Sequence, residues 1–590
     1  MSTTTTHDGS SPTELTVRAL LSGFIIGAML AMGNVYMGLK TGWWDSGNIT
    51  AAILGFALLQ VLRPFGSGTP SPRENNIVQA TAAAVGAMPA TAGLLGAVPA
   101  LSLMGHGYSS LTIFGWGLGL GLIGIAIAVP LRRRMLVDES LPFPTGIATA
   151  EIIGAMHAAG RAAIARARAV LGSFAGAMIV VWFRDGRPAW IPALTAFPGR
   201  LFGVPAEALT WGVSWSPILL GTGPLVGPRL GLSILFGACV AWGLIAPLLV
   251  RHGLVAAASY SSLREWLLWP GVALMLSGAL VQLALQARTF GRTLADLRRL
   301  RAGPTSAGGP TRPGRTRPGR TGLGIGVAAL AGVALTVSVG HFGFGLRPLA
   351  VLTAIVLSIL TASLCARCVG ETDTVPLSQM GQLTQLVLAG LSPGQPAAGI
   401  ATASVIAGDA AQTATTMSSL KTTHLLGGSP ARLVTAQLCG AVVGTLLSVP
   451  VYRLVVHAYG LGSQALPAPP AAVWRSVAEL TSRAGAALPP HAGAAAGIAL
   501  ALGAVLAFLG RTRAGGYLPS AVAAGAAFIM PAHYAVAICL GSLLYALARA
   551  FRPDATERYA QAIGAGAAAG EAFMGVLLAL LIGLGVVARG

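Results

Sequence analysis

Residues 408 to 426 read GDAAQTATTMSSLKTTHLL and place acidic, amide, hydroxyl and basic side chains inside an otherwise apolar chain. Asp409, Gln412, Lys421 and His424 could bind an ionic group or carry a proton. An ionised carboxylate at the centre of a membrane helix costs about 2.5 to 3.5 kcal/mol, so it needs a partner, a wet cavity or a proton. These residue types therefore indicate ion-pair, hydrogen-bond or proton-transfer chemistry.

Six carboxyl groups lie within or beside apolar, small-residue segments, whereas most of the 18 acids lie in expected loops. The six are Glu74, Glu151, Glu371, Asp373, Asp409 and Glu571. A desolvated carboxyl group can hold a proton and carry it across a membrane. All except Glu74 are therefore candidates for proton coupling, and structural pairing is the alternative for each one taken alone.

Lysine occurs at only two positions in a chain that has 36 arginines, Lys40 in GLKTG and Lys421 in SLKTTH. A lysine ammonium is compact and responds to burial, whereas arginine stays charged and forked. We expect each lysine to meet a substrate carboxylate or to pair with one of the six acids. Accidental survival of two lysines is the alternative.

Amide and aromatic side chains near these charges complete the predicted substrate site. We expect a cavity at the middle of the membrane to be lined by Glu74, Asn75, Asn76, Gln79, Asp409, Gln412 and Lys421. The full set of candidate substrate-binding residues adds Asn34, Tyr36, Lys40 and His424. The sequence has no HExxH motif and no GxxxxGK[ST] phosphate loop. We therefore expect no metal site and no cofactor, with a proton gradient instead of ATP as the energy source.

Membrane helices must position these residues, because 54% of the 590 residues are hydrophobic and only 9% are charged. Apolar runs of spanning length recur from Leu20 to Val587. Glycine, at 79 residues, allows helices to approach closely in lipid. We predict an all-α polytopic membrane protein with about 14 to 16 transmembrane helices, counting broken or re-entrant ones.

The expected spans follow from the apolar runs. In the first half they are 17–36, 49–63, 77–104, 108–131, 167–184, 216–250 and 262–287. In the second half they are 321–340, 348–369, 376–410, 412–426, 433–458, 492–510, 516–549 and 563–587. Prolines predict breaks in 77–104 and 516–549, and Gly227-Pro228 predicts one in 216–250. In LPFPTGIATAEIIGAMH, residues 141–157, Pro142, Pro144 and Gly146 are expected to break a re-entrant segment.

Residues 288–320 hold nine arginines and one acid in a stretch whose second part is rich in Pro and Gly. We interpret this stretch as a basic cytoplasmic loop between an N-terminal transmembrane half, 1–287, and a C-terminal half, 321–590. Its charge, part of the net +20, follows the positive-inside rule and needs no nucleic-acid partner. The same rule predicts a cytoplasmic N-terminus in the inner (cytoplasmic) membrane. The topology of 216–250 stays open.

A short internal repeat is indicated by Asn76-x-x-Gln79 and Asp409-x-x-Gln412, which are 333 residues apart. The same offset sets the first expected span near residue 350, where another begins. The positive-inside rule predicts that these two spans cross the membrane in opposite directions, as in transporters built from inverted repeats. Chance similarity in alanine-rich sequence is the alternative.

Five segments, in order along nearly the whole chain, resemble bacterial members of the oligopeptide transporter family, most closely its yellow stripe-like branch. The resemblance implies a duplicated, many-helix secondary transporter that takes up small peptides, or metal complexes of peptide-like chelators, with protons. Thr145 departs from it, because some relatives carry an acid there, and so does the arginine-rich loop. The segments are NVYMGLKTGWWDSGNITAAILGFAL (34–58), ENNIVQATAAAVG (74–86), LPFPTGIATAEIIGAMHA (141–158), GDAAQTATTMSSLKTTHLLGGSPARLVTAQLCGAVVG (408–444) and GAAAGEAFMGVLLALL (566–581).

We therefore expect a proton-coupled secondary transporter, not an enzyme, that imports small oligopeptides or peptide-like compounds by alternating access. An importer of metal-chelate complexes is the alternative within transport, and a passive channel would show flux without a proton gradient. An intramembrane enzyme is a remote alternative, because the GD at 408–409 lacks a YD partner. The expected partners are the lipid bilayer and a small-molecule substrate, with no nucleic acid; a homodimer stays open.

Overall fold

The structure is a computed structural model that describes most of the chain. The described residues are 14–65, 68–158, 160–186, 188–255, 257–285, 320–372, 381, 384–385, 395–482, 488–510 and 512–586. Within them, ten helical segments are long and apolar enough to cross a membrane, and strands are few and short. The chain is an all-α polytopic membrane protein, as its composition predicts.

The first half begins with a long helix and ends with another. Its helices are α1 (Val17–Thr41), α2 (Asn48–Val61), α3 (Pro72–Thr91), α4 (Ala97–Leu103), α5 (Ser110–Arg132), α6 (Pro144–Ala158), α7 (Gly160–Asp185), α8 (Pro217–Ala238), α9 (Ala246–Arg251) and α10 (Tyr260–Leu285). Two small antiparallel strand pairs follow α7. They pair β1 (Leu194–Ala196) with β4 (Gly212–Ser214), and β2 (Arg200–Leu201) with β3 (Val204–Pro205).

The second half contains several helices that begin with proline, whose fixed φ and missing N–H suit a first helical position. Its helices are α12 (Arg320–Phe342), α13 (Pro348–Thr372), α15 (Pro396–Leu425), α16 (Pro430–Tyr459), α17 (Pro469–Ser482), α18 (Ala492–Leu509), α19 (Ala521–Ile529), α20 (Ala532–Phe551) and α21 (Pro553–Gly583). Apart from Arg320, the predicted basic loop lies outside the described residues.

Three predicted interruptions are confirmed. The segment 77–104 is broken between α3 and α4, where Gly93 has φ 72°. The segment 516–549 is broken between α19 and α20 at Pro531. Inside α8, Gly227 has φ 79° and ψ 169° and bends the helix before Pro228. Glycine permits this backbone conformation and proline ends the preceding hydrogen-bond ladder.

Two predictions were wrong, one about residues 412–426 and one about residues 141–157. The polar stretch 412–426 is no separate span, because α15 runs unbroken through it from Pro396 to Leu425. Gly146 does not break its segment either, since α6 continues from Pro144 through it to Ala158. Gly146 instead allows close packing, because a Cβ there would lie 2.8 Å from Lys421 Cβ. The helix α17 was not predicted.

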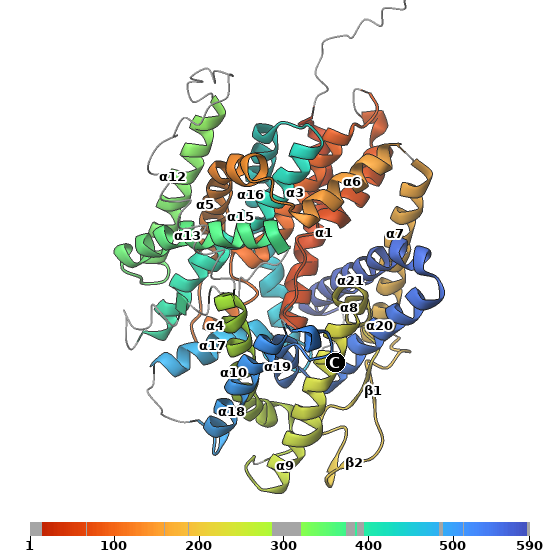
Figure 1. Cartoon of the computed structure of the whole chain (residues 1–590), viewed down its shortest axis with the longest axis vertical. Helices are drawn as coiled ribbons and strands as arrows, with labels where there is room; N and C mark the ends of the chain where they lie inside the picture. The colour runs from red at the N-terminus through yellow and green to blue at the C-terminus, as the bar shows by residue number, and fades with distance from the viewer. Residues whose placement is uncertain are drawn as a thin grey trace, which may run out of the picture.

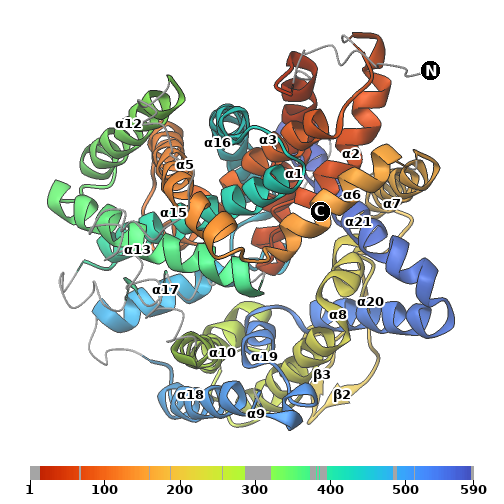
Figure 2. The ribbon, with the colours of Figure 1, turned by 45° about the horizontal axis from the view of Figure 1, so that its top comes forward.

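The helices form two bundles, each built from both halves of the sequence (Figures 1 and 2). The first bundle contains α1, α2, α3, α5, α6, α12, α13, α15 and α16. The second bundle contains α7, α8, α9, α10, α18, α19, α20 and α21. The bundles meet where α1 and α16 contact α21 and where α2 and α6 contact α7. Two bundles with a limited interface are an arrangement that can rock or gate around a site.

The packing exchanges equivalent helices between the two halves. The pair α1–α3 of the first half corresponds to the pair α13–α15 of the second half. The pair α7–α21 corresponds to the pair α18–α10, and in both of these pairs each half supplies one helix. Helix α3 contacts α16, whereas α15 contacts α5, so each partner comes from the other half. This exchange supports the repeat that the sequence indicated.

Two turns of similar sequence mark the repeat more sharply than the motif that predicted it. LPFP at 141–144 precedes α6, and LPAP at 466–469 precedes α17. The N–H of Phe143 donates to Gly370 O of α13 at 2.9 Å, and that of Ala468 donates to Leu39 O of α1 at 2.8 Å. Both donors have positive φ, 47° and 48°, which side chains rarely adopt. Two non-glycine residues in this conformation, with matching partners on α13 and α1, indicate that the two halves share this local geometry.

Candidate functional site

Helices α3 and α15 lie side by side and antiparallel, joined by polar side chains. Three hydrogen bonds define this seam: Asn76 Nδ2 to Thr423 Oγ1 at 2.8 Å, Gln79 Nε2 to Ser419 Oγ at 3.3 Å, and Thr91 Oγ1 to Gln412 Oε1 at 3.2 Å. Because residue 76 is level with 423, Asp409 lies about 20 Å further along the helix axis. The two motifs of the sequence repeat therefore occupy opposite ends of the seam.

The Asn76 end of the seam has acceptor atoms that remain unpaired. Gln79 Nε2 donates to Asn48 Oδ1 at 2.7 Å, and Asn75 Nδ2 donates to Ala52 O at 3.1 Å. Within the described residues, Asn75 Oδ1, Asn76 Oδ1 and Gln79 Oε1 are buried without a hydrogen-bond partner. Unpaired buried polar atoms are costly, so this end can receive water or a polar ligand group.

The Asp409 end holds a carboxyl group without a described basic partner. Asp409 is fully buried, and Ser358 Oγ of α13 donates to its Oδ2 at 2.5 Å. Among the described residues its Oδ1 has no hydrogen-bond partner, and no base forms an ion pair with it. One and two turns further on, Gln412 Nε2 and Thr416 Oγ1 are likewise unpaired in the described part. Asp409 is thus a buried acid at one end of a row of polar side chains that continues with Gln412 and Thr416.

Lys40 and Glu571 form an ion pair between the two bundles, with Nζ 2.8 Å from Oε1. Lys40 is in the last turn of α1, and Glu571 is inside α21. Arg184 of α7 lies 3.2 Å from the same carboxylate oxygen. Lys40 and Glu571 are 6% and 0% exposed, so the pair is shielded from solvent. Each lysine was expected to meet a substrate carboxylate or to pair with one of the six acids, and in the structure Lys40 pairs with one of these acids, Glu571.

Tyr36, a predicted site residue, belongs to this same network. Its hydroxyl lies 3.4 Å from Lys40 Nζ, and its ring meets Tyr459 edge-on with centroids 5.6 Å apart. Tyr534 of α20 presents its ring to Lys40 Nζ at 5.7 Å. The ammonium therefore lies between aromatic faces as well as beside a carboxylate.

Lys421 binds main-chain oxygen. Its Nζ donates to Leu141 O at 2.8 Å, and the neighbouring Thr422 donates to Gly146 O at 3.0 Å. Both bonds tie α15 to the LPFP turn and to the start of α6. Lys421 fixes the position of this turn.

Glu74 and Asn34 hold chain segments together. Arg18 donates to both carboxylate oxygens of Glu74 at 2.6 and 2.7 Å, and Thr16 Oγ1 donates at 2.5 Å. These bonds fasten the start of α1 to the start of α3. Asn34 Nδ2 donates to Asp45 O and Gly86 O, both at 2.7 Å, and its Oδ1 accepts from Asp45 N–H. The loop after α1 is thereby folded back against α1.

The remaining predicted residues lie apart from these networks. Glu151 on α6 and His424 at the end of α15 are exposed. Glu371 lies 3.5 Å from Arg367, which also contacts Glu139 at 2.6 Å. Asp373 lies outside the described residues.

The sequence interpretation missed residues that complete these networks. They are Arg18, Asn48, Arg184, Ser358 and Ser216, whose hydroxyl donates to Glu571. Arg184 carried a usable signal, because it is a base at the end of an apolar span and is followed by Asp185. The serines carried none, since hydroxyls are frequent throughout membrane helices.

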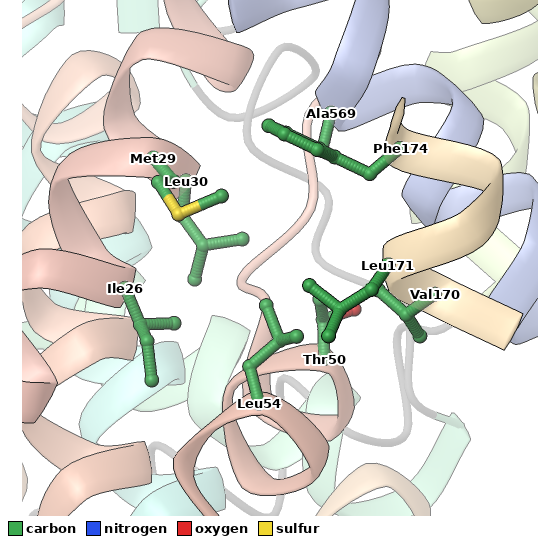
Figure 3. Close-up of a pocket in the computed structure, with 9 residues that line it drawn as sticks. All are labelled: Ile26, Met29, Leu30, Thr50, Leu54, Val170, Leu171, Phe174 and Ala569. Atoms are coloured by element: carbon green, nitrogen blue, oxygen red, sulfur yellow. The ribbon is translucent and has the colours of Figure 1, made fainter. Parts of the chain in front are cut away.

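A small hollow lies where the bundles meet, between α1 and α2 on one side and α7 and α21 on the other (Figure 3). Thr50 is the one polar residue among its lining side chains. The lining is Ile26, Met29, Leu30, Thr50, Leu54, Val170, Leu171, Phe174 and Ala569. Such an apolar surface offers no partner for a charged group.

Three proteins are similar in sequence to this chain over most of their length. "Putative oligopeptide transporter YGL114W" of Saccharomyces cerevisiae is 25% identical over 90% of both proteins. "Metal-nicotianamine transporter YSL2" of Arabidopsis thaliana is 24% identical over 90% of this chain and 88% of its own. "Putative oligopeptide transporter" of Haemophilus influenzae is 26% identical over 94% of both. Residues 14–582 match the family described as OPT oligopeptide transporter protein. The chain therefore belongs to the OPT family of membrane transporters.

Proposed function

We propose that this protein is a proton-coupled importer of small oligopeptides or peptide-like compounds that works by alternating access of its two bundles. Family membership supports transport, and two of the relatives above bear names that specify oligopeptides. We place the protein in the cytoplasmic membrane with its N-terminus inside, following the positive-inside rule.

The buried carboxyl group of Asp409 is the observation that carries the proposal of proton coupling. Asp409 is 0% exposed and has no described ion-pair partner. Binding a proton removes the cost of an unpaired charge in the membrane, about 2.5 to 3.5 kcal/mol. A carboxyl group that is neutral when buried and ionised when exposed to water can bind a proton on one side of the membrane and release it on the other.

The polar seam between α3 and α15 supports a route for that proton. Gln412 and Thr416 follow Asp409 on α15 and offer unpaired polar atoms within the described part of the chain. Beyond them, the pairs Gln79–Ser419 and Asn76–Thr423 continue the row. Water held by such atoms can relay protons along a helix interface.

A metal-chelate substrate is the second candidate, because one relative is named a metal-nicotianamine transporter. Chelators of this kind resemble peptides in carrying both amino and carboxylate groups. The same ion-pairing residues would therefore serve either substrate class. The metal ion would be cargo held by its chelator.

The test is uptake into proteoliposomes with an imposed inward proton gradient. The substrates are a panel of di- to tetrapeptides and nickel–nicotianamine. The proposal expects accumulation of at least one of these substrates above its outside concentration, and collapse of that accumulation when a protonophore is added. Competition between labelled peptide and nickel–nicotianamine separates the two substrate classes. Substrate flux that does not depend on the proton gradient would indicate a passive pathway and contradict the proposal.

A further inference from the structure

Glu571 is held inside the second bundle by several donors. Ser216 Oγ donates to its two oxygens at 2.8 and 2.7 Å, and the N–H of Ile218 donates at 2.8 Å. Ser216 and Ile218 lie at the start of α8, whose N-terminal dipole favours a negative charge. Arg184 adds a contact at 3.2 Å and has its own acid, Asp185, at 2.7 Å. Glu571 therefore keeps donors and a counter-charge without Lys40.

Lys40 is in the opposite position. Within the part of the chain that the structure describes, Glu571 is its one carboxylate partner, and Glu571 belongs to the other bundle. Its ammonium also contacts the Tyr36 hydroxyl and the rings of Tyr36 and Tyr534. Tyr534 also belongs to the second bundle, on α20, so only Tyr36 would travel with Lys40.

Separation of the bundles would thus leave the two charges unequally placed. The carboxylate of Glu571 would keep Arg184, Ser216 and the start of α8. The ammonium of Lys40 would keep one tyrosine and no anion. A cation stripped of its partner in a membrane protein is costly, so Lys40 is the member of the pair that needs a replacement.

We propose that Lys40 is the position where the carboxylate group of a transported substrate binds, replacing Glu571 when the two bundles separate. The inference rests on the proposed function and names the chemical group that the site selects. A peptide C-terminus and a chelator carboxylate share this chemistry. When the carboxylate leaves, Lys40 returns to Glu571 and the bundles close again.

The first test needs no ligand and compares melting temperatures of the purified protein. Lys40→Met removes the cation but leaves Glu571 with its own donors, whereas Glu571→Gln leaves the Lys40 ammonium buried without an acid. The melting temperatures of the wild type and of Lys40→Met are expected to be close together, and that of Glu571→Gln is expected to be clearly lower. Arg549→Met is the matched control, because it breaks an exposed ion pair with Glu557. A Lys40→Met protein that melts as low as Glu571→Gln would overturn the proposed asymmetry.

The second test measures uptake of trialanine, of trialanine amide and of nickel–nicotianamine in proteoliposomes. In the wild type, trialanine is expected to be preferred over its amide by about tenfold or more, since hydrogen bonds to charged groups contribute about 1.5 to 3 kcal/mol. Lys40→Met should abolish this preference, and Lys40→Arg should retain much of it. Glu571→Gln should retain the preference because Lys40 remains. The nickel–nicotianamine arm shows whether a chelator carboxylate uses the same lysine.

The outcomes separate the inference from the proposed function. Gradient-driven uptake in which Lys40→Met lowers acid and amide equally would overturn the carboxylate assignment and leave proton-coupled transport standing. Absence of gradient-driven uptake of every probe by the wild type would overturn the proposed function and the inference with it. A preference that disappears only in Lys40→Met would support the inference.

Discussion

Lys40 Nζ lies 2.8 Å from Glu571 Oε1, although 531 residues separate the two in sequence. The first and last long helices of the described chain thus meet at one buried ion pair, and that pair joins the first bundle to the second. Any motion that separates the bundles must break it. The pair is therefore both a contact that holds the closed arrangement and a place where a competing ion can act.

The Arg18–Glu74 pair is predicted to stabilise the fold without selecting substrates. Glu74→Gln leaves the buried guanidinium of Arg18 without its acid, and breaking such a pair typically costs about 3 to 5 kcal/mol. Thermal unfolding of the purified variant should show a lower midpoint. Glu557→Gln is the control, since its exposed pair with Arg549 contributes about 0 to 1 kcal/mol. A change in peptide preference in Glu74→Gln, at unchanged stability, would assign Glu74 to the substrate site instead.

Gly146 is predicted to be intolerant of a larger side chain. A Cβ at this position would lie 2.8 Å from both Lys421 Cβ and Ser418 O, so Gly146→Ala must push α6 away from α15. Overpacking of this kind typically costs about 1 to 3 kcal/mol. Gly154→Ala on the same helix is the control, because its Cβ would meet nothing within 4 Å. Equal melting temperatures for the two variants would show that α6 and α15 are not closely packed.

The main-chain N–H of Ala468 is predicted to be essential to the LPAP turn. Ala468→Pro removes the donor to Leu39 O and imposes a negative φ where the backbone has +48°. This variant should fail to accumulate as folded protein, as judged by gel filtration in detergent. Ala468→Gly keeps the N–H and accepts positive φ, so it should remain folded. Folding of the proline variant would contradict the role of this turn.

Local signals predicted most of the helices. Apolar length placed α1, α5 and α13, and proline or glycine placed the breaks at Gly227 and Pro531, because these effects depend on neighbouring residues alone. The continuity of α15 could not be seen in this way. Its polar residues are accommodated by partners on α3, α5 and α13, including Ser358 for Asp409, and those partners are distant in sequence.

The polar residue types in the membrane helices could be read from the sequence, but which of them lie together could not. Helical spacing could show that Asn76 and Asp409 belong to matching motifs, yet the antiparallel packing of α3 and α15 puts them at opposite ends of the seam. The LPFP and LPAP turns give a weak repeat signal in the sequence, because they are four residues long and 325 residues apart, whereas the first motif is offset by 333. Pairing of Lys40 with Glu571 depends on bundle assembly, which no local pattern encodes.

Asp409→Asn removes the carboxyl group on which the proposed proton coupling depends. The measurement is uptake by proteoliposomes under an inward proton gradient, together with exchange of labelled for unlabelled substrate without a gradient. Asparagine keeps the shape of the side chain and its contact with Ser358 but cannot release a proton. We expect Asp409→Asn to exchange substrate but no longer to accumulate it, at any outside pH. Accumulation by Asp409→Asn at the level of the wild type, with the same dependence on pH, would show that Asp409 does not carry the coupled proton.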